Sequence, residues 1–434
     1  MDDLAQRLRT ALGDDAVSVD PGVRRTASTD WAHMSPVLTA RLPAGLADVV
    51  AFPADPGQLA RAVALAHDAG VPVTPRGKGT GNYGQAIPLR DGLVVDLTRA
   101  RRVLDVGAGW VTAEAGTPFV TLEAAARATG QELAMFPSTV GSTLGGFLAG
   151  GAGGTGSIEN GWLWSGFVTA LDVVPCTGAE ELVHLAGPDT GPLLHAYGTS
   201  GVIATATVRL RPRRDWTALF ASFDRWTDAV AAGLALMASL APVPRLVSVD
   251  EPGIVAALPA DPGIPRGRTS LRAIVDTGVL TAARQAVTAA GGVVEEVRAG
   301  GAGLLTSLSF NHATHRVQKT RPGLAHLQVG APALVERADE VRALLPGALL
   351  HLDGLGGPDG PEFVGLLLTR YTGEEALRGA MDALRGIGVH VSDPHTWELA
   401  EPLDDVRRAA ARYDPAGLLN PGKLPAAVPA RPVG

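Results

Sequence analysis

Apolar positions recur at helical spacing and at strand spacing in turn along the first half of the chain. Asp55 followed by Pro56 is typical of a helix N-terminus, and apolar residues at helical spacing continue from there to Gly70. Thr117 and Pro118 open a second helix, which is predicted to end at Gly130. Short apolar runs between turn residues predict the strands of this half at 71–74, 93–97, 103–106, 110–115, 167–175 and 202–210.

The pattern changes after Pro212, which lies among three arginines, and strand and helix candidates alternate from residue 216 to residue 400. The order of these elements predicts an α+β fold in which the sheet of the second half is mainly antiparallel. The strands we predict here are 269–276, 292–297, 348–352 and 363–369, and the helices are 224–240, 280–290, 331–345 and 374–385.

Length and composition narrow the class of protein. A chain of 434 residues with 46% hydrophobic and 19% charged residues predicts two or more domains, each with its own core. A net charge of -7 with scattered Lys and Arg argues against nucleic acid and against an anionic membrane surface as partners. The single cysteine, Cys176, fits a reducing compartment, and no apolar run is long enough for membrane insertion. We therefore expect a cytoplasmic protein that acts on a small molecule.

Glycine, with 54 residues, concentrates in two clusters, and the first contains GxGxxG at 79–84 behind a predicted strand. A Rossmann fingerprint needs a helix directly after its last glycine and an acidic residue about 20 positions later. Here residues 85–92 lead into another strand, and Asp96 comes too early. A flexible surface turn is one alternative. The reading that we favour is a nest of backbone N–H groups around a pyrophosphate.

The second cluster reads PSTVGSTLGGFLAGGAGG at 137–154, and two glycine-rich loops suit a long ligand that contacts the protein along its length. Together with PRGKGTGNYG at 75–84 and GTSGVI at 198–203, this cluster resembles the FAD-binding domain of the FAD-linked oxidases, of the vanillyl-alcohol oxidase and para-cresol methylhydroxylase (PCMH) type. The segment YDPAGLLNPGKL at 413–424 is similar to the C-terminal signature of the glycolate oxidase and D-lactate dehydrogenase branch.

The resemblance covers about residues 45–212 and 402–424 and implies a domain layout. It predicts a PCMH-type FAD-binding domain of two subdomains, followed by an α+β substrate or cap domain with a mainly antiparallel sheet. The segments we expect are an N-terminal segment at 1–44, the FAD-binding domain at 45–212, the substrate domain at 213–400, a segment returning to the flavin at 401–424 and a flexible tail at 425–434.

The resemblance also implies which residues bind FAD. The first loop would hold the pyrophosphate, the second would line the pyrophosphate and the flavin edge, the 201–203 segment would hold adenine, and the C-terminal pair would lie near the isoalloxazine. The residues assigned in this way are Pro75, Arg76, Gly77, Lys78, Gly79, Thr80, Gly81, Asn82, Pro137, Ser138, Thr139, Gly141, Ser142, Thr143, Gly145, Gly146, Gly150, Gly153, Gly201, Val202, Ile203, Asn420 and Lys423.

Two departures from the family pattern affect the chemistry. The first loop has no His, and Cys176 is better explained as a small buried hydrophobe, so the FAD is expected to be non-covalent. The branch often carries HGDGN-H, whose histidines help bind a metal. The nearest segment here, HLDGLGG at 351–357, lacks the Asn and the second His, and no metal is predicted.

The densest polar segment of the second half is SFNHATHRVQK at 309–319. A solvated helix face is one explanation. The functional explanation is a substrate wall that faces the flavin, with Asn311 on it, His312 as the base for a hydroxyl proton, and Arg316 or Lys319 for an anionic group. His395, in a loop shortly before the C-terminal signature, is a second candidate for the base.

The predicted function is a flavoprotein oxidoreductase that transfers hydride from a small alcohol or 2-hydroxy acid to flavin N5. The sequence does not identify the electron acceptor, which could be oxygen, a quinone or a protein, and it leaves a homodimer open. Two alternatives belong to other classes. One is a non-catalytic FAD-binding subunit of a glycolate-oxidase-like complex, and the other is a flavin-dependent transferase like the alkylglycerone-phosphate synthases.

Overall fold

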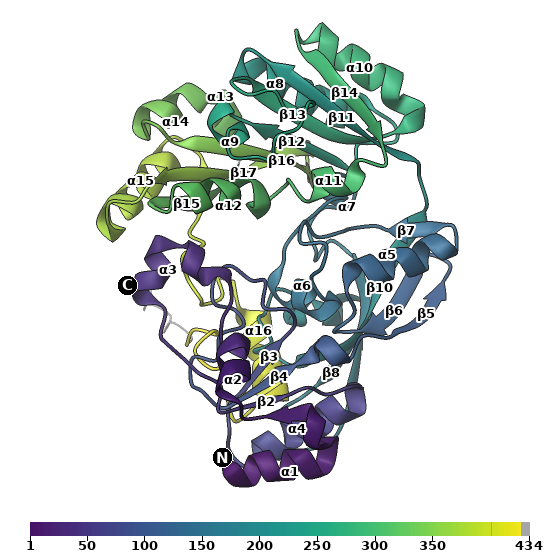
Figure 1. The fold of residues 1–434 in the computed structure, drawn as a ribbon, viewed down its shortest axis with the longest axis vertical. Coiled ribbons are helices and arrows are strands. Elements are labelled where there is room, and N and C mark those ends of the chain that lie inside the picture. The colour runs from purple at the N-terminus through teal and green to yellow at the C-terminus, as the bar shows by residue number, and fades with distance from the viewer. Residues whose placement is uncertain (331, 401, 427–434) are drawn as a thin grey trace, which may run out of the picture.

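The first of three sheets is small and carries the first glycine loop at the end of one strand. In this computed structural model, which describes residues 1–330, 332–400 and 402–426, the sheet has the order β1-β2-β4-β3. Strands β2, β4 and β3 are parallel, and β1 is antiparallel to β2. Helices α1 and α4 pack against each other in the lower part of Figure 1. The bounds are β1 Val17–Ser18, β2 Val49–Ala51, β3 Val73–Arg76, β4 Leu93–Asp96, α1 Asp2–Leu12, α2 Pro21–Ala27, α3 Pro36–Arg41 and α4 Pro56–Asp68.

The second sheet is antiparallel and carries the second glycine cluster. Its order is β5-β6-β10-β8-β9, and β7 pairs with the far end of β10. One apolar core is shared with the first sheet, because side chains of both sheets and of α4 belong to the same buried cluster. The bounds are β5 Val103–Gly107, β6 Trp110–Glu114, β7 Gln131–Leu133, β8 Val168–Val174, β9 Val183–Ala186, β10 Val202–Pro212, α5 Phe119–Ala128, α6 Leu144–Gly150 and α7 Ser157–Asn160.

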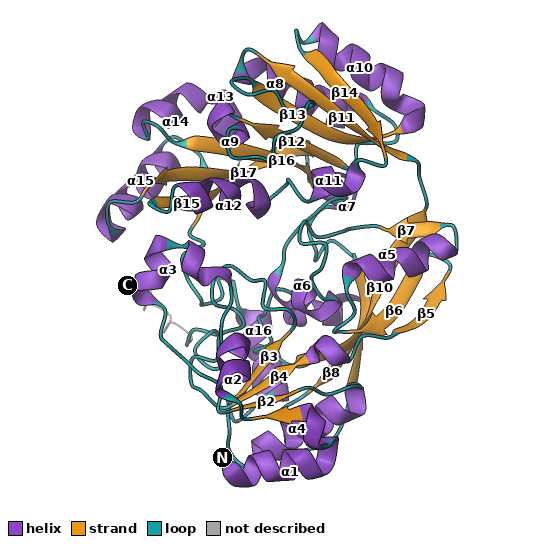
Figure 2. Ribbon diagram, viewed as in Figure 1, coloured by secondary structure: helices purple, strands orange, loops and turns teal. Residues whose placement is uncertain are grey.

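The third sheet has eight strands in the order β14-β11-β13-β12-β16-β17-β15-β18, and every pairing in it is antiparallel. Alternation along the strands gives the sheet two apolar faces. One face packs against α8, α10, α13, α14 and α15, and the other packs against α9, α11 and α12. Figure 2 shows α11 and α12 on the side of this sheet that faces the rest of the molecule.

The bounds of the third region are β11 Trp216–Phe223, β12 Leu246–Asp250, β13 Thr269–Asp276, β14 Val293–Ala299, β15 Leu324–Gly330, β16 Leu349–Gly357, β17 Gly360–Arg370, β18 His390–Ser392, α8 Trp226–Ser239, α9 Pro252–Val255, α10 Leu280–Ala289, α11 Ala302–Thr306, α12 Asn311–Thr320, α13 Ala333–Glu336, α14 Ala338–Leu344 and α15 Glu374–Gly386.

The last helix, α16 (Asp404–Tyr413), follows the third sheet in the chain and packs against the core of the first two sheets. Tyr413 joins the core shared by the first two sheets, and Leu419 forms a parallel bridge with Val73 at the start of β3. Figure 1 shows α16, in yellow, among the purple and blue elements of the first half. The C-terminal segment therefore lies beside the strand that leads into the first glycine loop.

The α+β class and the antiparallel sheet of the second half are confirmed. The helix predicted at 331–345 is instead two short helices, α13 and α14. Four strands that we did not predict, β11, β12, β15 and β18, complete the third sheet. All eight residues of β11 are buried, so the strand lacks the alternation of apolar and polar residues that marks a half-exposed strand.

Candidate FAD site

The first glycine loop follows β3 and contains no helix between residues 77 and 92. The Rossmann geometry is therefore absent there, as the sequence indicated. Gly79 and Gly84 have φ values of 61° and 81°, which glycine adopts without strain. A Cβ on Gly77 would lie 2.1 Å from Thr143 Oγ1, so the first loop passes directly against the second one.

The second cluster is partly helical, which the sequence analysis did not predict. Thr143 is the N-cap of α6, and its hydroxyl accepts a hydrogen bond from the Gly146 N–H at 3.3 Å. Gly145 packs against β6, because a Cβ there would lie 2.7 Å from the Ala115 Cβ. The glycine at 145 is thus required by packing within the protein, whatever else contacts it.

Other positions of the two loops face open space. A Cβ on Gly141 would have only Lys78 Nζ near it, at 4.0 Å, and a Cβ on Gly150 would have no atom within 4 Å. The Ser142 hydroxyl is buried without a hydrogen-bond partner among the described residues. Lys78 also lines a pocket of about 340 Å³ together with Thr98, Arg99, Arg101, Gly116 and Pro118.

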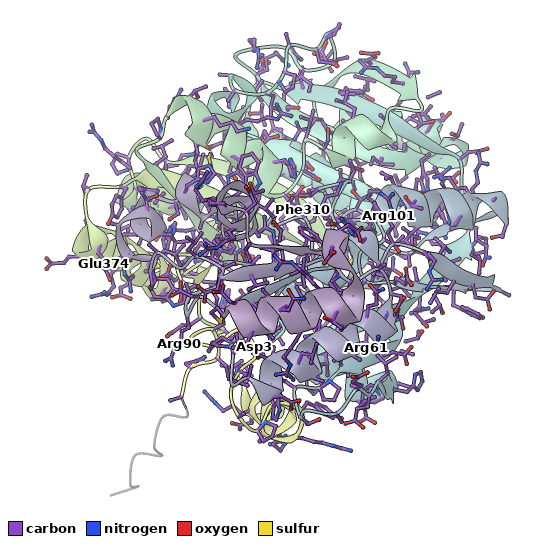
Figure 3. All side chains as sticks on the ribbon, turned by 60° about the horizontal axis from the view of Figure 1, so that its bottom comes forward. Asp3, Arg61, Arg90, Arg101, Phe310 and Glu374 are labelled. Atoms are coloured by element: carbon purple, nitrogen blue, oxygen red, sulfur yellow. The ribbon has the colours of Figure 1, made fainter. Side chains whose placement is uncertain are left out.

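This combination of groups fits the pyrophosphate of FAD. The pocket brings three cationic side chains together, and neither Lys78 nor Arg101 forms an ion pair within the part of the chain that the structure describes. Arg101 is labelled in Figure 3. Unpaired cations, a free hydroxyl and open space beside glycine backbone are the features that an anionic group needs.

The segment before β10 runs beside the first loop and has an unusual backbone. His195 and Tyr197 both have a φ of 52°, which is strained for side chains of this size. A Cβ on Gly198 would lie 2.4 Å from Pro75 Cγ, so this segment contacts the start of the first loop. Gly201, with a φ of 141°, leads into Val202 and Ile203, which pair with Val174 and Val173 of β8.

Asn420 and Lys423 join the C-terminal segment to these loops. Asn420 is fully buried, and its side-chain amide donates to the carbonyl oxygens of Gln85 at 2.9 Å and Tyr197 at 2.8 Å. The Lys423 ammonium donates to the Gly84 carbonyl, and burial lowers the pKa of this lysine to about 7. Both residues hold loop backbone in place, and the proximity to the isoalloxazine stays a prediction.

Helix α12 bridges the two glycine loops from the third sheet. The His312 ring lies 2.9 Å (Nε2 to Oγ1) from Thr139 in the second loop, and the Asn311 amide donates to the Tyr83 hydroxyl of the first loop at 3.4 Å. Burial, and then the charges of Arg316 and Lys319, lower the pKa of His312, so the ring is neutral at pH 7 and can accept a proton. Arg316 forms no hydrogen bond or ion pair within the described residues, and its Nε is buried without a partner.

A second histidine group lies next to Tyr83. The Tyr83 hydroxyl is 2.8 Å from His326 Nε2 on β15, and His395 Nδ1 is 2.8 Å from the Ser35 hydroxyl. The His326 ring centroid lies 5.9 Å from that of His315 and also 5.9 Å from that of His395. Burial lowers the pKa of all three histidines, to about 4 for His315.

The sequence analysis missed most of this histidine group. It named His395, which is only 2% exposed, but it did not name Tyr83, His326 or Ser35 as site residues. These residues come from four distant segments, and no local motif connects them. The one available signal was the position of Tyr83 inside the first glycine loop.

His351 of the HLDGLGG segment pairs with carboxylates inside the third sheet. Its Nδ1 is 2.7 Å from Asp250 and its Nε2 is 2.7 Å from Asp353, with the ring fully buried. These two carboxylates raise the pKa of His351 to about 10 against the opposing effect of burial. Within residues 1–330, 332–400 and 402–426 there is no group of three or more His, Cys, Asp or Glu side chains arranged to hold a metal ion.

Comparison with known proteins is consistent with this site. Residues 47–183 match the family model described as FAD binding domain. An uncharacterised FAD-linked oxidoreductase of Mycobacterium tuberculosis is 32% identical over 201 residues, covering 43% of this chain and 44% of that protein. The D-lactate dehydrogenase of Archaeoglobus fulgidus is 30% identical over 193 residues, covering 42% and 43%. The glycolate oxidase subunit GlcD of Bacillus subtilis is 27% identical over 194 residues, covering 42% and 41%.

A solved structure of another protein resembles the fold over nearly the whole chain. A structure of alkyldihydroxyacetonephosphate synthase matches 98% of this chain and 86% of its own with a TM-score of 0.78, at 17% identity. This likeness shows a shared fold, and the match of residues 47–183 to the FAD binding domain family defines the class as an FAD-binding protein. About two fifths of the chain is also similar in sequence to an FAD-linked oxidoreductase and to a D-lactate dehydrogenase. The chain matches less than half the length of these three sequence relatives.

None of the helices in the described residues is long and apolar enough to cross a membrane.

Proposed function

We propose that the protein is an FAD-dependent oxidoreductase that oxidises a small 2-hydroxy acid or a related alcohol. The match to the FAD binding domain and the names of the relatives, which include a D-lactate dehydrogenase and a glycolate oxidase subunit, support this class. Bound FAD would supply the hydride acceptor. The residues proposed to hold it are those of the two loops around Lys78 and Gly141, with the 201–203 segment for the adenine.

The observation that carries the proposal is the position of His312. It lies on α12 of the third sheet, yet it is hydrogen-bonded to Thr139 in the second glycine loop, so it faces the FAD-binding domain. Its lowered pKa keeps the ring neutral, as a general base that accepts the hydroxyl proton must be. Arg316, one helical turn further along and without an acidic partner in the described structure, would hold the carboxylate of the substrate.

The test is anaerobic reduction of the purified flavoprotein by D-lactate and by glycolate. His312→Ala should retain FAD and slow flavin reduction by about 10²- to 10⁴-fold, the usual contribution of a general base. In the wild type the reduction rate should rise with pH through a value below the ordinary 6.5 of histidine, because the folded pKa is lowered. His390→Ala is the matched control, since His390 is exposed on β18 and bonds only Ser392 among the described residues.

Other outcomes would point elsewhere. If His312→Ala is reduced at the wild-type rate and His395→Ala is not, the base is His395. If neither acid nor a panel of alcohols reduces the wild-type flavin, the oxidoreductase proposal is wrong. Co-purification with an iron–sulfur protein would then favour the non-catalytic subunit, and exchange of substituents without net redox change would favour the transferase. Reoxidation by air, by quinone or only by a protein would identify the electron acceptor.

A further inference from the structure

A buried polar network crosses three strands of the third sheet beneath α12. In the antiparallel register of β12 and β16, Asp250 lies opposite His351, and Ser248 lies opposite Asp353. Arg272 of β13 donates to Asp250. Leu246 of β12 and Ile274 of β13 are each two residues away from a network residue and therefore lie on the same sheet face. Both belong to the apolar cluster that contains the α12 residues Ala313 and Val317.

Asp353 links this network to the N-cap of α12, and Arg272 also donates to the carbonyl of Leu308, two residues before the N-cap, at 3.3 Å. The Asp353 Oδ2 accepts the backbone N–H of Phe310 at 2.7 Å and also lies 2.7 Å from His351 Nε2. Its Oδ1 accepts the Ser248 hydroxyl at 2.6 Å. Phe310 is the N-cap of α12, so the carboxylate holds the backbone at the point where the helix begins.

Phe310 has a conformation that side-chain-bearing residues rarely adopt. Its φ is 49° and its ψ is -143°, close to a region that is essentially restricted to glycine. Such a residue persists only where its surroundings impose the conformation, and strain of this kind gathers at functional sites. Figure 3 labels Phe310 near the middle of the molecule in that view.

The strained residue immediately precedes both bridges from α12 to the glycine loops. Asn311, which contacts Tyr83, and His312, which contacts Thr139, are the first two residues of the helix. A change in the backbone at Phe310 would rotate or shift this first turn. Contacts of 2.9 Å and 3.4 Å would then be lost, because hydrogen bonds weaken steeply with distance and angle.

We propose that Asp353 is a positioning residue, which holds Phe310 in its strained conformation and thereby places Asn311 and His312 against the two glycine loops. The role of His312 in catalysis rests on the function proposed above, but the placement of α12 does not. Ser248 and His351 hold the Asp353 carboxylate, Asp250 holds His351, and Arg272 holds Asp250. The HLDGLGG segment would thus fix the substrate wall by the hydrogen bond that its aspartate accepts from the Phe310 N–H.

The test compares hydrogen exchange of residues 311–320 with that of β12 and β13 in the FAD-loaded protein. Asp353→Ala should speed exchange in α12 by about tenfold or more beyond any change in β12 and β13, because the helix start loses its anchor in addition to the contacts that Asp353 makes with Ser248 and His351. Ser222→Ala is the matched control. It removes a buried hydroxyl of β11 in the same sheet that bonds Arg268 and lies outside this network, and α12 should exchange at the wild-type rate.

A second substitution separates positioning from general loss of stability. Glycine adopts the Phe310 conformation without strain, so Phe310→Gly in the Asp353→Ala background should restore much of the α12 protection. In anaerobic reduction by D-lactate, Asp353→Ala should lower the limiting rate with unchanged FAD content, and the added glycine should raise the rate again. If Asp353→Ala does not fold, Asp353→Ser, whose hydroxyl is too short to reach Phe310, takes its place.

Each outcome of these measurements either supports or overturns the positioning role of Asp353. Wild-type exchange of α12 in the Asp353 variant, or no rescue by glycine at 310, would overturn the positioning role. An equal increase of the exchange rate in α12, β12 and β13 would also overturn it, since Asp353 would then act on the stability of the sheet alone. If the wild-type protein is not reduced by D-lactate, the proposed function fails, while the exchange measurements still decide the role of Asp353.

Discussion

The pairing of His351 with two buried carboxylates makes a specific prediction about stability and pH. The folded pKa of His351 is about 10, whereas the ordinary value is 6.5. Because the folded value is raised, the stabilising contribution is fully present below pH 6.5 and is lost as the pH rises through about 10. A difference of about 3.5 units corresponds to about 5 kcal/mol at most, or about 1.4 kcal/mol for each pH unit in that window.

His351→Gln removes the imidazolium and leaves Asp250 and Asp353 without their shared cation. Breaking a buried pair in this way typically costs about 3 to 5 kcal/mol. We therefore expect the variant to be less stable than wild type at about pH 6, with the difference in unfolding free energy shrinking by about 1.4 kcal/mol for each unit between about pH 6.5 and about pH 9.

The assay is urea denaturation of the cofactor-free wild type and variant across this pH range. His390→Gln provides the control, because His390 is exposed and any offset it causes should not vary with pH in the same way. A difference between wild type and His351→Gln that stays constant across the range would refute the reasoning, since it would mean that the buried ring is neutral. A difference that grows with pH would mean that the sign of the pairing is wrong.

Three further predictions concern the FAD site. Gly141→Val should fold normally, because a Cβ at this position meets only Lys78 Nζ, at 4.0 Å, but it should lose FAD if the open space belongs to the cofactor. Gly191→Val is the control and should keep its flavin colour, because a Cβ there also faces open space in the same half of the chain. Acid precipitation of the purified protein should release the flavin into the supernatant, because the first loop has no His and Cys176 is fully buried with its pKa raised to about 12; yellow colour in the pellet would contradict this expectation. In the cofactor-free protein, the wild type should gain stability relative to Lys423→Met as the pH rises from about 7 to about 10, because the folded pKa of Lys423 lies below its ordinary value. Equal pH profiles of the two proteins in urea denaturation would show that the pKa of this lysine is not lowered.

The sequence alone determined the features that depend on local chemistry. The absence of a helical pattern after Gly84 argued against a Rossmann turn, and the structure has no helix there. The polar segment at 309–319 was interpreted from the sequence either as a solvated helix face or as a substrate wall, and α12 (Asn311–Thr320) is the helix that carries His312 and Arg316. Such features are fixed by neighbours within a few residues, so a linear pattern carries them.

The tertiary structure decided which distant side chains meet. Tyr83 lies 243 positions before His326, and His395 comes later still. The three side chains form one group because the Tyr83 hydroxyl meets the His326 ring on β15, and that ring lies beside the His395 ring. The HLDGLGG segment looked like a weakened metal motif, and only the register of β12 against β16 placed Asp250 opposite His351 and formed an ion-pair network there. Strand register and domain packing arise from cooperative burial over the whole chain, and a local pattern does not contain them.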